Sequence, residues 1–109
     1  MKKLLAGGAA AALAAGAFAV PAVWAATKTV QVKDNKFVPT SLTVKSGTTV
    51  KWVWKGSAPH NVTVTSGPKK FKSTVQTKGT FSKKINTKGT YKIVCTIHAP
   101  NMKMTLKVT

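Results

Sequence analysis

Three residues near the C-terminal end of the chain have side chains that bind soft metal ions: Cys95, His98 and Met102. They place a thiol, an imidazole and a thioether within eight residues. Cys95 ends one stretch of alternating apolar residues and Met104 begins the next, so residues 96–102 are expected to form a tight loop that reverses the chain. Such a loop brings the three side chains toward one point. A soft thiolate, imidazole nitrogens and a weak thioether together select copper that cycles between two oxidation states.

A trigonal copper site of this kind needs a second histidine, and His60 is the only other histidine in the chain. It lies two residues before Val62 and four before Val64, so in an extended strand the three side chains face the same way. This alternation predicts an inward-facing position for His60 at the start of a strand. The alternative role is a hydrogen-bonded histidine in the core or in a turn. The residue types therefore predict one type 1 (blue) copper ion, with these ligands: His60, Cys95, His98 and Met102.

The elements that must position these side chains are short runs of alternating apolar and polar residues. One face of each run is rich in lysine and threonine, and the other face is apolar. Glycine, with serine, lysine or proline beside it, separates the runs as expected for turns. The pattern predicts an all-β sandwich in a single domain. The predicted strands are 29–33, 41–45, 50–55, 60–64, 91–95 and 104–108.

Two regions fit the sandwich less well. Phe81 and Ile85 share the inward parity with Lys83, which predicts an edge strand or a bulge. The pattern is weak over residues 67–79, where a surface loop is expected, with room for a short helical turn. Trp54 is expected to pack in the core or at its rim, without a chemical role.

The beginning of the chain has the features of a targeting segment. Residues 1–25 combine two lysines, an apolar run over 4–20 and small residues at the end. They predict a secretory signal peptide, cleaved after Ala25 or Ala26, and an exported, periplasmic protein. A retained membrane anchor is the alternative, although the run is rich in alanine and glycine and only marginally long enough to span a bilayer. Residues 26–109 would form a soluble copper-binding domain.

The chain has 18 lysines, no arginine and a single acid, Asp34, so its formal net charge is +17. This charge predicts a positive field that steers the protein toward acidic redox partners or an anionic membrane surface. Adaptation to an acidic exterior, where carboxylates are protonated, is a second explanation. The missing arginines and the dispersed lysines argue against nucleic-acid binding.

Cys95 is the only cysteine in the chain, which excludes an internal disulfide. An inert buried thiol is the alternative to a role as a metal ligand.

Four segments together resemble the plastocyanin/pseudoazurin/amicyanin group of cupredoxins, in the same order along the chain. These segments are NKFVP at 35–39, GTTVKW at 47–52, PHNV at 59–62 and GTYKIVCTIH at 89–98. The resemblance implies a Greek-key β-sandwich with copper at one end, bound by the four residues already named. It also implies that Asn61 braces the copper loops and donates a hydrogen bond toward the sulfur of Cys95.

The axial ligand departs from the group's spacing. Members of this group commonly place two or four residues between the loop histidine and the axial methionine, whereas three separate His98 from Met102. Met104 is therefore a rival ligand, although its parity with Leu106 predicts a core position. Met102 is preferred because it lies in the loop and precedes a lysine, as in the group.

Such a site transfers single electrons and makes no bonds, so the protein is not expected to be an enzyme. Acidic redox proteins are expected to dock transiently near His98, whose neighbours Ala99 and Pro100 form a small apolar patch. A monomer is expected. The alternative function is a periplasmic copper carrier that uses the same ligands. An oxidase or reductase would need further histidines, and a zinc site would have little use for a thioether.

Overall fold

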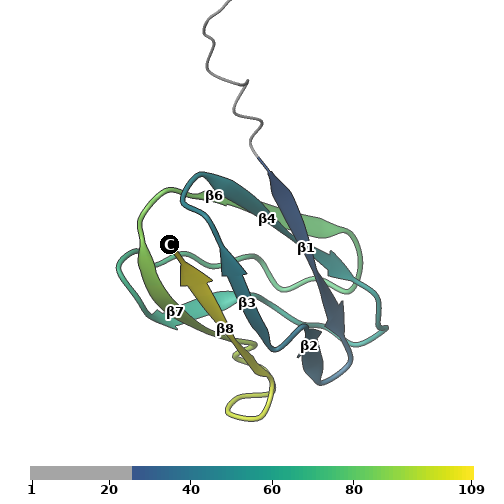
Figure 1. Cartoon of the computed structure of the whole chain (residues 1–109). Helices are drawn as coiled ribbons and strands as arrows, with labels where there is room; N and C mark the ends of the chain where they lie inside the picture. Colours follow the sequence, from purple (N-terminus) through teal and green to yellow (C-terminus); the bar gives the residue numbers. More distant parts are fainter. Residues whose placement is uncertain (1–25) are drawn as a thin grey trace, which may run out of the picture.

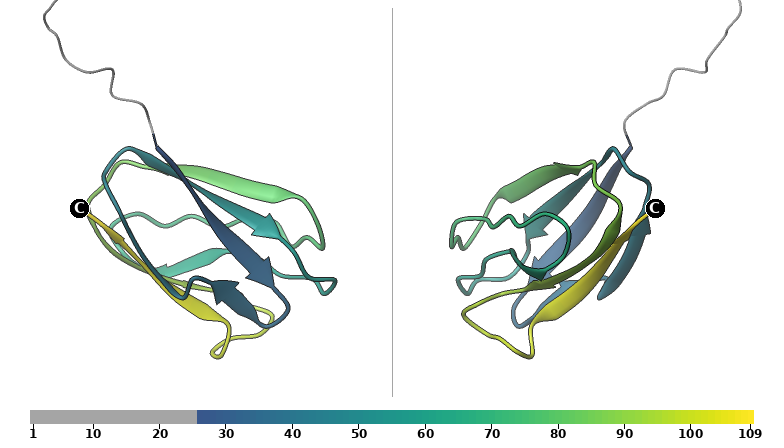
Figure 2. Two further views of the ribbon diagram at one scale, coloured as in Figure 1. Left: turned by 45° about the vertical axis from the view of Figure 1, so that its right-hand side comes forward. Right: turned by 90° about the vertical axis from the view of Figure 1, so that its left-hand side faces the viewer.

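The computed structural model describes residues 26–109, which form two β-sheets packed face to face (Figures 1 and 2). The predicted signal peptide, residues 1–25, lies outside the described residues. The strands of the described part are β1 (Thr27–Lys33), β2 (Lys36–Val38), β3 (Ser41–Val44), β4 (Thr48–Trp54), β5 (Thr63–Ser66), β6 (Thr80–Ile85), β7 (Gly89–Val94) and β8 (Lys103–Val108).

The strand order is β2-β1-β4-β6 in one sheet and β3-β8-β7-β5 in the other. Strand β1 pairs with β4 in parallel and β3 pairs with β8 in parallel, while the remaining neighbours are antiparallel. The all-β sandwich predicted from the alternation is thereby confirmed. Within residues 26–109, no helix has the length and apolar character to cross a membrane.

Alternation along the strands places the core between the two sheets. In β4, Val50, Trp52 and Trp54 are buried while the residues between them are half-buried. Tyr91 and Phe37, from β7 and β2, are also fully buried against this core. Each such side chain contributes roughly 1.5–3 kcal/mol of hydrophobic stabilisation relative to full exposure.

Strand β6 is an edge strand, one of the two alternatives that the position of Lys83 predicted, since its only partner in the sheet is β4. Lys83 lies opposite the buried Val50 in the β4–β6 register, so its Cα is at a core-facing position. Its ammonium lies 5.9 Å from the centroid of the Phe71 ring. The edge position lets the lysine stem cover an aromatic surface while its charge stays exposed.

The loop over residues 67–79 connects β5 to β6 and contains no helical turn. It contributes Phe71 to an aromatic cluster, with ring centroids 6.0 Å from Trp52 and 6.2 Å from Tyr91. Its later part pairs with the segment before β5 through an isolated bridge between Gln76 and His60. The loop therefore covers one side of the core and also contacts the segment that contains a predicted ligand.

Candidate metal centre

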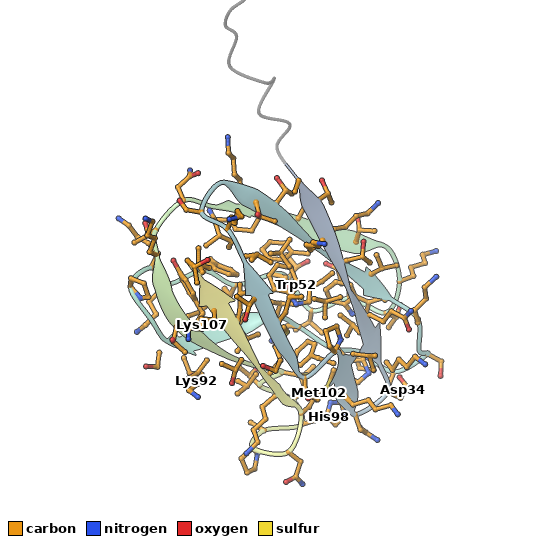
Figure 3. All side chains as sticks on the ribbon, viewed as in Figure 1. Asp34, Trp52, Lys92, His98, Met102 and Lys107 are labelled. Carbon is orange, nitrogen blue, oxygen red and sulfur yellow. The ribbon has the colours of Figure 1, made fainter. Side chains whose placement is uncertain are left out.

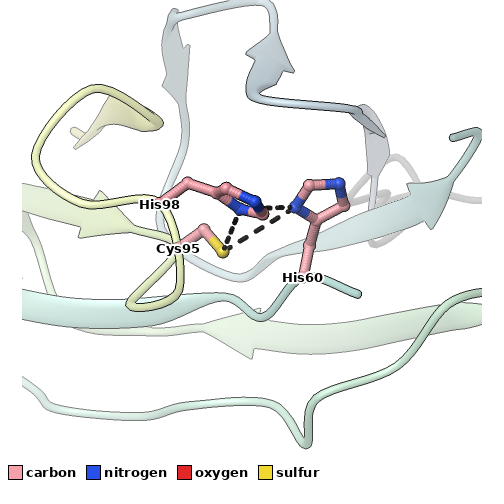
Figure 4. A group of neighbouring side chains, drawn as sticks. All are labelled: His60, Cys95 and His98. Carbon is pink, nitrogen blue, oxygen red and sulfur yellow. Dashed lines mark hydrogen bonds between the residues drawn. The ribbon is translucent and has the colours of Figure 1, made fainter. Parts of the chain in front are cut away.

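Three of the four predicted ligands come together at one end of the sandwich. Nδ1 of His60 lies 3.2 Å from Nδ1 of His98, and Sγ of Cys95 lies 3.8 Å and 3.5 Å from these two nitrogens (Figure 4). His60 and Cys95 are fully buried and His98 is half-buried. Two imidazole nitrogens and a thiol sulfur therefore form a compact triangle that a single metal ion can bind.

The loop between β7 and β8 brings Cys95 and His98 together, as the spacing predicted. The backbone amide of Cys95 donates to the carbonyl of Met102 at 3.0 Å. Within the loop, the amide of His98 donates to the carbonyl of Cys95 at 3.2 Å, and the amide of Met102 donates to the carbonyl of His98 at 3.3 Å. These hydrogen bonds close a tight turn that contains all three residues.

The segment around His60 differs from its prediction, because it is not part of a regular strand. Strand β5 begins only at Thr63, and both Asn61 and Val62 are buried, so alternation fails here. His60 instead forms paired backbone hydrogen bonds, 3.0 Å each, with Gln76 of the 67–79 loop. This irregular backbone is held by neighbouring segments rather than by a sheet.

Trp54 has a positioning contact that the sequence did not indicate. Its indole Nε1 donates a hydrogen bond to the carbonyl of His60 at 3.3 Å, and the indole is almost fully buried. The prediction of a packing role alone was therefore incomplete. The end of β4 anchors the backbone of a ligand residue.

Asp34 is the most important site residue that the sequence reasoning missed. Its Oδ1 lies 2.9 Å from Nε2 of the buried His60. Because an ionised carboxylate only accepts hydrogen bonds, Nε2 donates, and a neutral imidazole held in this way has its lone pair on Nδ1, which faces Cys95. The one available signal was that Asp34 is the single acid in the whole sequence.

The turn after β4 also donates hydrogen bonds to the Asp34 carboxylate. The backbone amides of Ser57 and Ala58 donate to it, at 3.1 Å and 2.9 Å to Oδ1. A Cβ at Gly56 would collide with the carboxylate and lie 2.8 Å from the Asp34 amide nitrogen, so only glycine permits this approach. The hydrogen bond from His60, followed by those from the two amides, holds the pKa of Asp34 well below its usual range.

Asn61 braces the two ligand segments, as expected, but not through the sulfur of Cys95. Its Oδ1 accepts a hydrogen bond from the Thr96 amide at 2.9 Å, and its Nδ2 donates to the Thr96 hydroxyl at 2.7 Å. Both ends of the side-chain amide are thus engaged with the residue after Cys95. The side chain does not make the predicted hydrogen bond to the sulfur, because Nδ2 donates to the hydroxyl.

Comparisons with known proteins agree with this geometry. Residues 25–109 match the family of copper-binding proteins of the plastocyanin/azurin type. The chain is 39% identical to amicyanin-alpha of Methylorubrum extorquens over 98 residues, which cover 85% of this chain and 82% of that protein. The chain belongs to the plastocyanin/azurin family of copper-binding proteins.

Solved structures of cupredoxins have the same fold. A methionine-to-alanine mutant of amicyanin in its Cu(I) state has a TM-score of 0.68 and 29% identity, with 76% of this chain and 82% of that chain covered. A Cu-containing nitrite reductase from Thermus scotoductus has a TM-score of 0.67 and 27% identity. That match covers 89% of this chain but only 25% of the reductase, so the likeness is to one part of a larger enzyme.

Copper is the metal that this cupredoxin binds, because the family and the donor set agree. Hard cations prefer oxygen ligands, whereas the triangle of His60, Cys95 and His98 offers nitrogen and sulfur. The buried thiol also has no cysteine with which to form a disulfide.

Met102 and Met104 are both buried, but the backbone places them differently. Met102 is hydrogen-bonded through its backbone to Cys95 and His98, and Figure 3 shows it beside His98 at the end of the sandwich. Met104 lies within β8, paired in register with Ile93 of β7, which is a core residue. Its predicted role as a core strand residue is consistent with that position.

Proposed function

We propose that the protein is an exported electron carrier with one type 1 copper ion bound by His60, Cys95, His98 and Met102. The observation that supports this most directly is the convergence of two Nδ1 atoms and one sulfur within 3.8 Å of one another. Copper, when bound, supplies a one-electron couple between its two oxidation states. Met102 would supply the fourth ligand, because its backbone is hydrogen-bonded to two of the other three residues.

The protein's own contribution is to hold the ligand atoms in a fixed arrangement. Asp34 sets the tautomer of His60, Trp54 holds the His60 carbonyl, and Asn61 ties this segment to the residue after Cys95. A protein that holds the ligand atoms in nearly the same positions in both oxidation states keeps the reorganisation energy of electron transfer small. These contacts come from three separate segments, so the site is supported from several sides.

Electrons are proposed to enter and leave through the half-buried His98. Its neighbour Ile97 is 46% exposed, and Ala99 and Pro100 are also exposed, so an apolar rim surrounds this ligand edge. A small apolar rim suits brief redox encounters, which use small interfaces. The many lysines favour acidic redox partners and would raise the rate of association at low salt.

The proposed setting is the periplasm, reached with a signal peptide over residues 1–25 and cleavage after Ala25 or Ala26. A copper carrier with the same ligands is the competing function. Full burial of His60 and Cys95 supports retention of the metal rather than exchange, and so supports the electron carrier.

The test is to add cupric ion to the purified protein and to record its visible spectrum through repeated cycles of reduction and oxidation. We expect an intense thiolate-to-copper band that bleaches on reduction, returns on oxidation and is absent in Cys95→Ser. Copper content should stay constant through the cycles in the presence of a competing chelator. A folded protein without the band would contradict the site, and steady loss of copper to the chelator would favour the carrier.

A further inference from the structure

A pocket of about 240 Å³ lies along edge strand β6, between this strand and the 67–79 loop. Four lysines line it: Lys69 and Lys70 from the loop, and Lys83 and Lys84 from β6. The pocket reaches the turn between β6 and β7, whereas Cys95 follows the opposite end of β7. It is therefore separate from the proposed copper site.

The floor of the pocket is aromatic and already ordered. Phe71 and Tyr91 line it, with ring centroids 6.2 Å apart, and the Lys83 ammonium lies 5.9 Å above the Phe71 ring. The aromatic cluster beneath includes Trp52, so the floor belongs to the core of the sandwich. An occupant would meet a pre-formed surface instead of having to order one.

Three backbone acceptors of the pocket wall are already in use. The carbonyl of Ile85 accepts from the Gly47 amide at 2.7 Å, and the carbonyl of Asn86 accepts from the Ser46 hydroxyl at 2.8 Å. The carbonyl of Thr87 accepts from the Tyr91 hydroxyl at 2.6 Å. With these three acceptors in use, the lysine side chains are the main donors that the lining offers to a molecule in the pocket.

No acidic side chain of this protein can neutralise those ammonium groups. The single acid, Asp34, is bound to His60 and to the turn after β4, in a different part of the fold. Four positive charges around one cavity repel one another, and a bound anion would relieve that repulsion.

We propose that this lysine pocket, defined by Lys69, Lys70, Lys83 and Lys84, is a binding site for small multivalent phosphate anions. Phosphate groups combine two or more negative charges with several acceptor oxygens, which suits ammonium donors. The volume is below the range of about 300–1,000 Å³ that is typical of sites for drug-sized ligands, so a small anion fits it better than a large one. Binding stabilises the folded protein, since the site depends on two segments that only the fold brings together.

The probe is sodium pyrophosphate, titrated calorimetrically into the copper-loaded protein at constant ionic strength set with sodium chloride. The visible copper band is recorded in the same samples to show that the metal is retained. We expect saturable binding of one anion per chain, together with amide chemical-shift changes at Ile85 and Thr87. Thermal stability should rise more with pyrophosphate than with chloride at equal ionic strength.

The decisive comparison uses two variants of equal net charge. Lys70→Gln/Lys83→Gln removes two pocket charges, and Lys28→Gln/Lys107→Gln removes two exposed lysines outside the pocket. We expect the pocket variant to bind pyrophosphate at least about tenfold more weakly, because two charge-assisted bonds are lost, and the control variant to stay within about twofold. Equal weakening in both variants, or no saturable binding, would overturn the proposal.

A second arm distinguishes free phosphate anions from lipid headgroups. Vesicles with an anionic phospholipid are compared with zwitterionic vesicles, with pyrophosphate as competitor. Vesicle binding that the pocket variant alone loses, and that pyrophosphate displaces, would identify a phosphate headgroup as a source of the ligand. Vesicle binding that falls equally in both variants would show general attraction of a positive surface and would count against the pocket.

Discussion

Oδ1 of Asp34 lies 2.9 Å from Nε2 of His60, so the only acidic side chain in the sequence contacts a proposed copper ligand. The His60 imidazole is fully buried, and the carboxylate is 42% exposed, so the pair links the interior of the site to its surface. The contact engages Nε2 and so leaves Nδ1 as the nitrogen that would bind the metal. It also places the one negatively charged side chain of this lysine-rich sequence beside the proposed centre.

Replacing this carboxylate by an amide tests its electrostatic role. Asp34→Asn keeps an acceptor for Nε2 but removes the negative charge. In the unmodified protein that charge favours the oxidised copper ion, which carries the larger positive charge. We expect affinity for Cu(II) to fall by about tenfold, as is typical when a partner of a ligand is changed. If affinity for Cu(I) is unaffected, the reduction potential rises by about 60 mV, which voltammetry measures. An unchanged potential would show that solvent screens the charge completely.

A substitution at Gly56 tests the position of the same carboxylate. In Gly56→Ala, the new Cβ overlaps the Asp34 carboxylate, so the carboxylate must move. We expect a loss of about 1–3 kcal/mol in the free energy of unfolding, measured with urea, because overpacked contacts of this kind cost that much. In the Asp34→Ala background the loss should be smaller, since the side-chain overlap is gone. Equal losses in both backgrounds would place the strain in the backbone alone.

The two methionines are distinguished by matched substitutions. Met102→Leu and Met104→Leu both keep an apolar side chain of similar volume, so each should change stability by less than about 1.5 kcal/mol. Only the axial ligand should also shift the reduction potential and the visible spectrum. We expect the larger shift for Met102→Leu. A larger shift for Met104→Leu would reassign the axial ligand.

Tyr91 makes stability depend on pH in the alkaline range. Burial raises the pKa of Tyr91, while its hydroxyl donates to the Thr87 carbonyl at 2.6 Å. A folded-state pKa above the unfolded value of about 10 means that its contribution is complete below pH 10 and is lost progressively above it. Urea unfolding between neutral pH and pH 11 should show this decline.

The control is Tyr91→Phe, which removes the ionisable group. It should cost about 1 kcal/mol at neutral pH, because the hydrogen bond to Thr87 is lost. Its stability should decline less steeply than that of the unmodified protein above pH 10. Equal slopes would assign the alkaline loss to the lysines instead.

The alternation of residues was sufficient to predict the sandwich, because side-chain parity is a local property of extended chain. It also predicted the tight loop that brings Cys95 and His98 together, since both lie within a few residues of one another. One lysine at an inward-facing position predicted that β6 is an edge strand or bulged, and the structure shows the edge strand. The segment at His60 was mispredicted because tertiary contacts with the 67–79 loop, rather than a sheet, determine its backbone.

The sequence by itself therefore determined the fold class, the copper chemistry and the ligand types, all of which depend on residue identity and short spacing. Only the tertiary structure showed that Asp34 contacts His60, 26 residues away, and that Asn61 contacts Thr96, 35 residues away. It also brought Lys70 and Lys83 to one pocket. Such contacts depend on strand order and register, including the parallel pairing of β1 with β4, and no local pattern of residues specifies these.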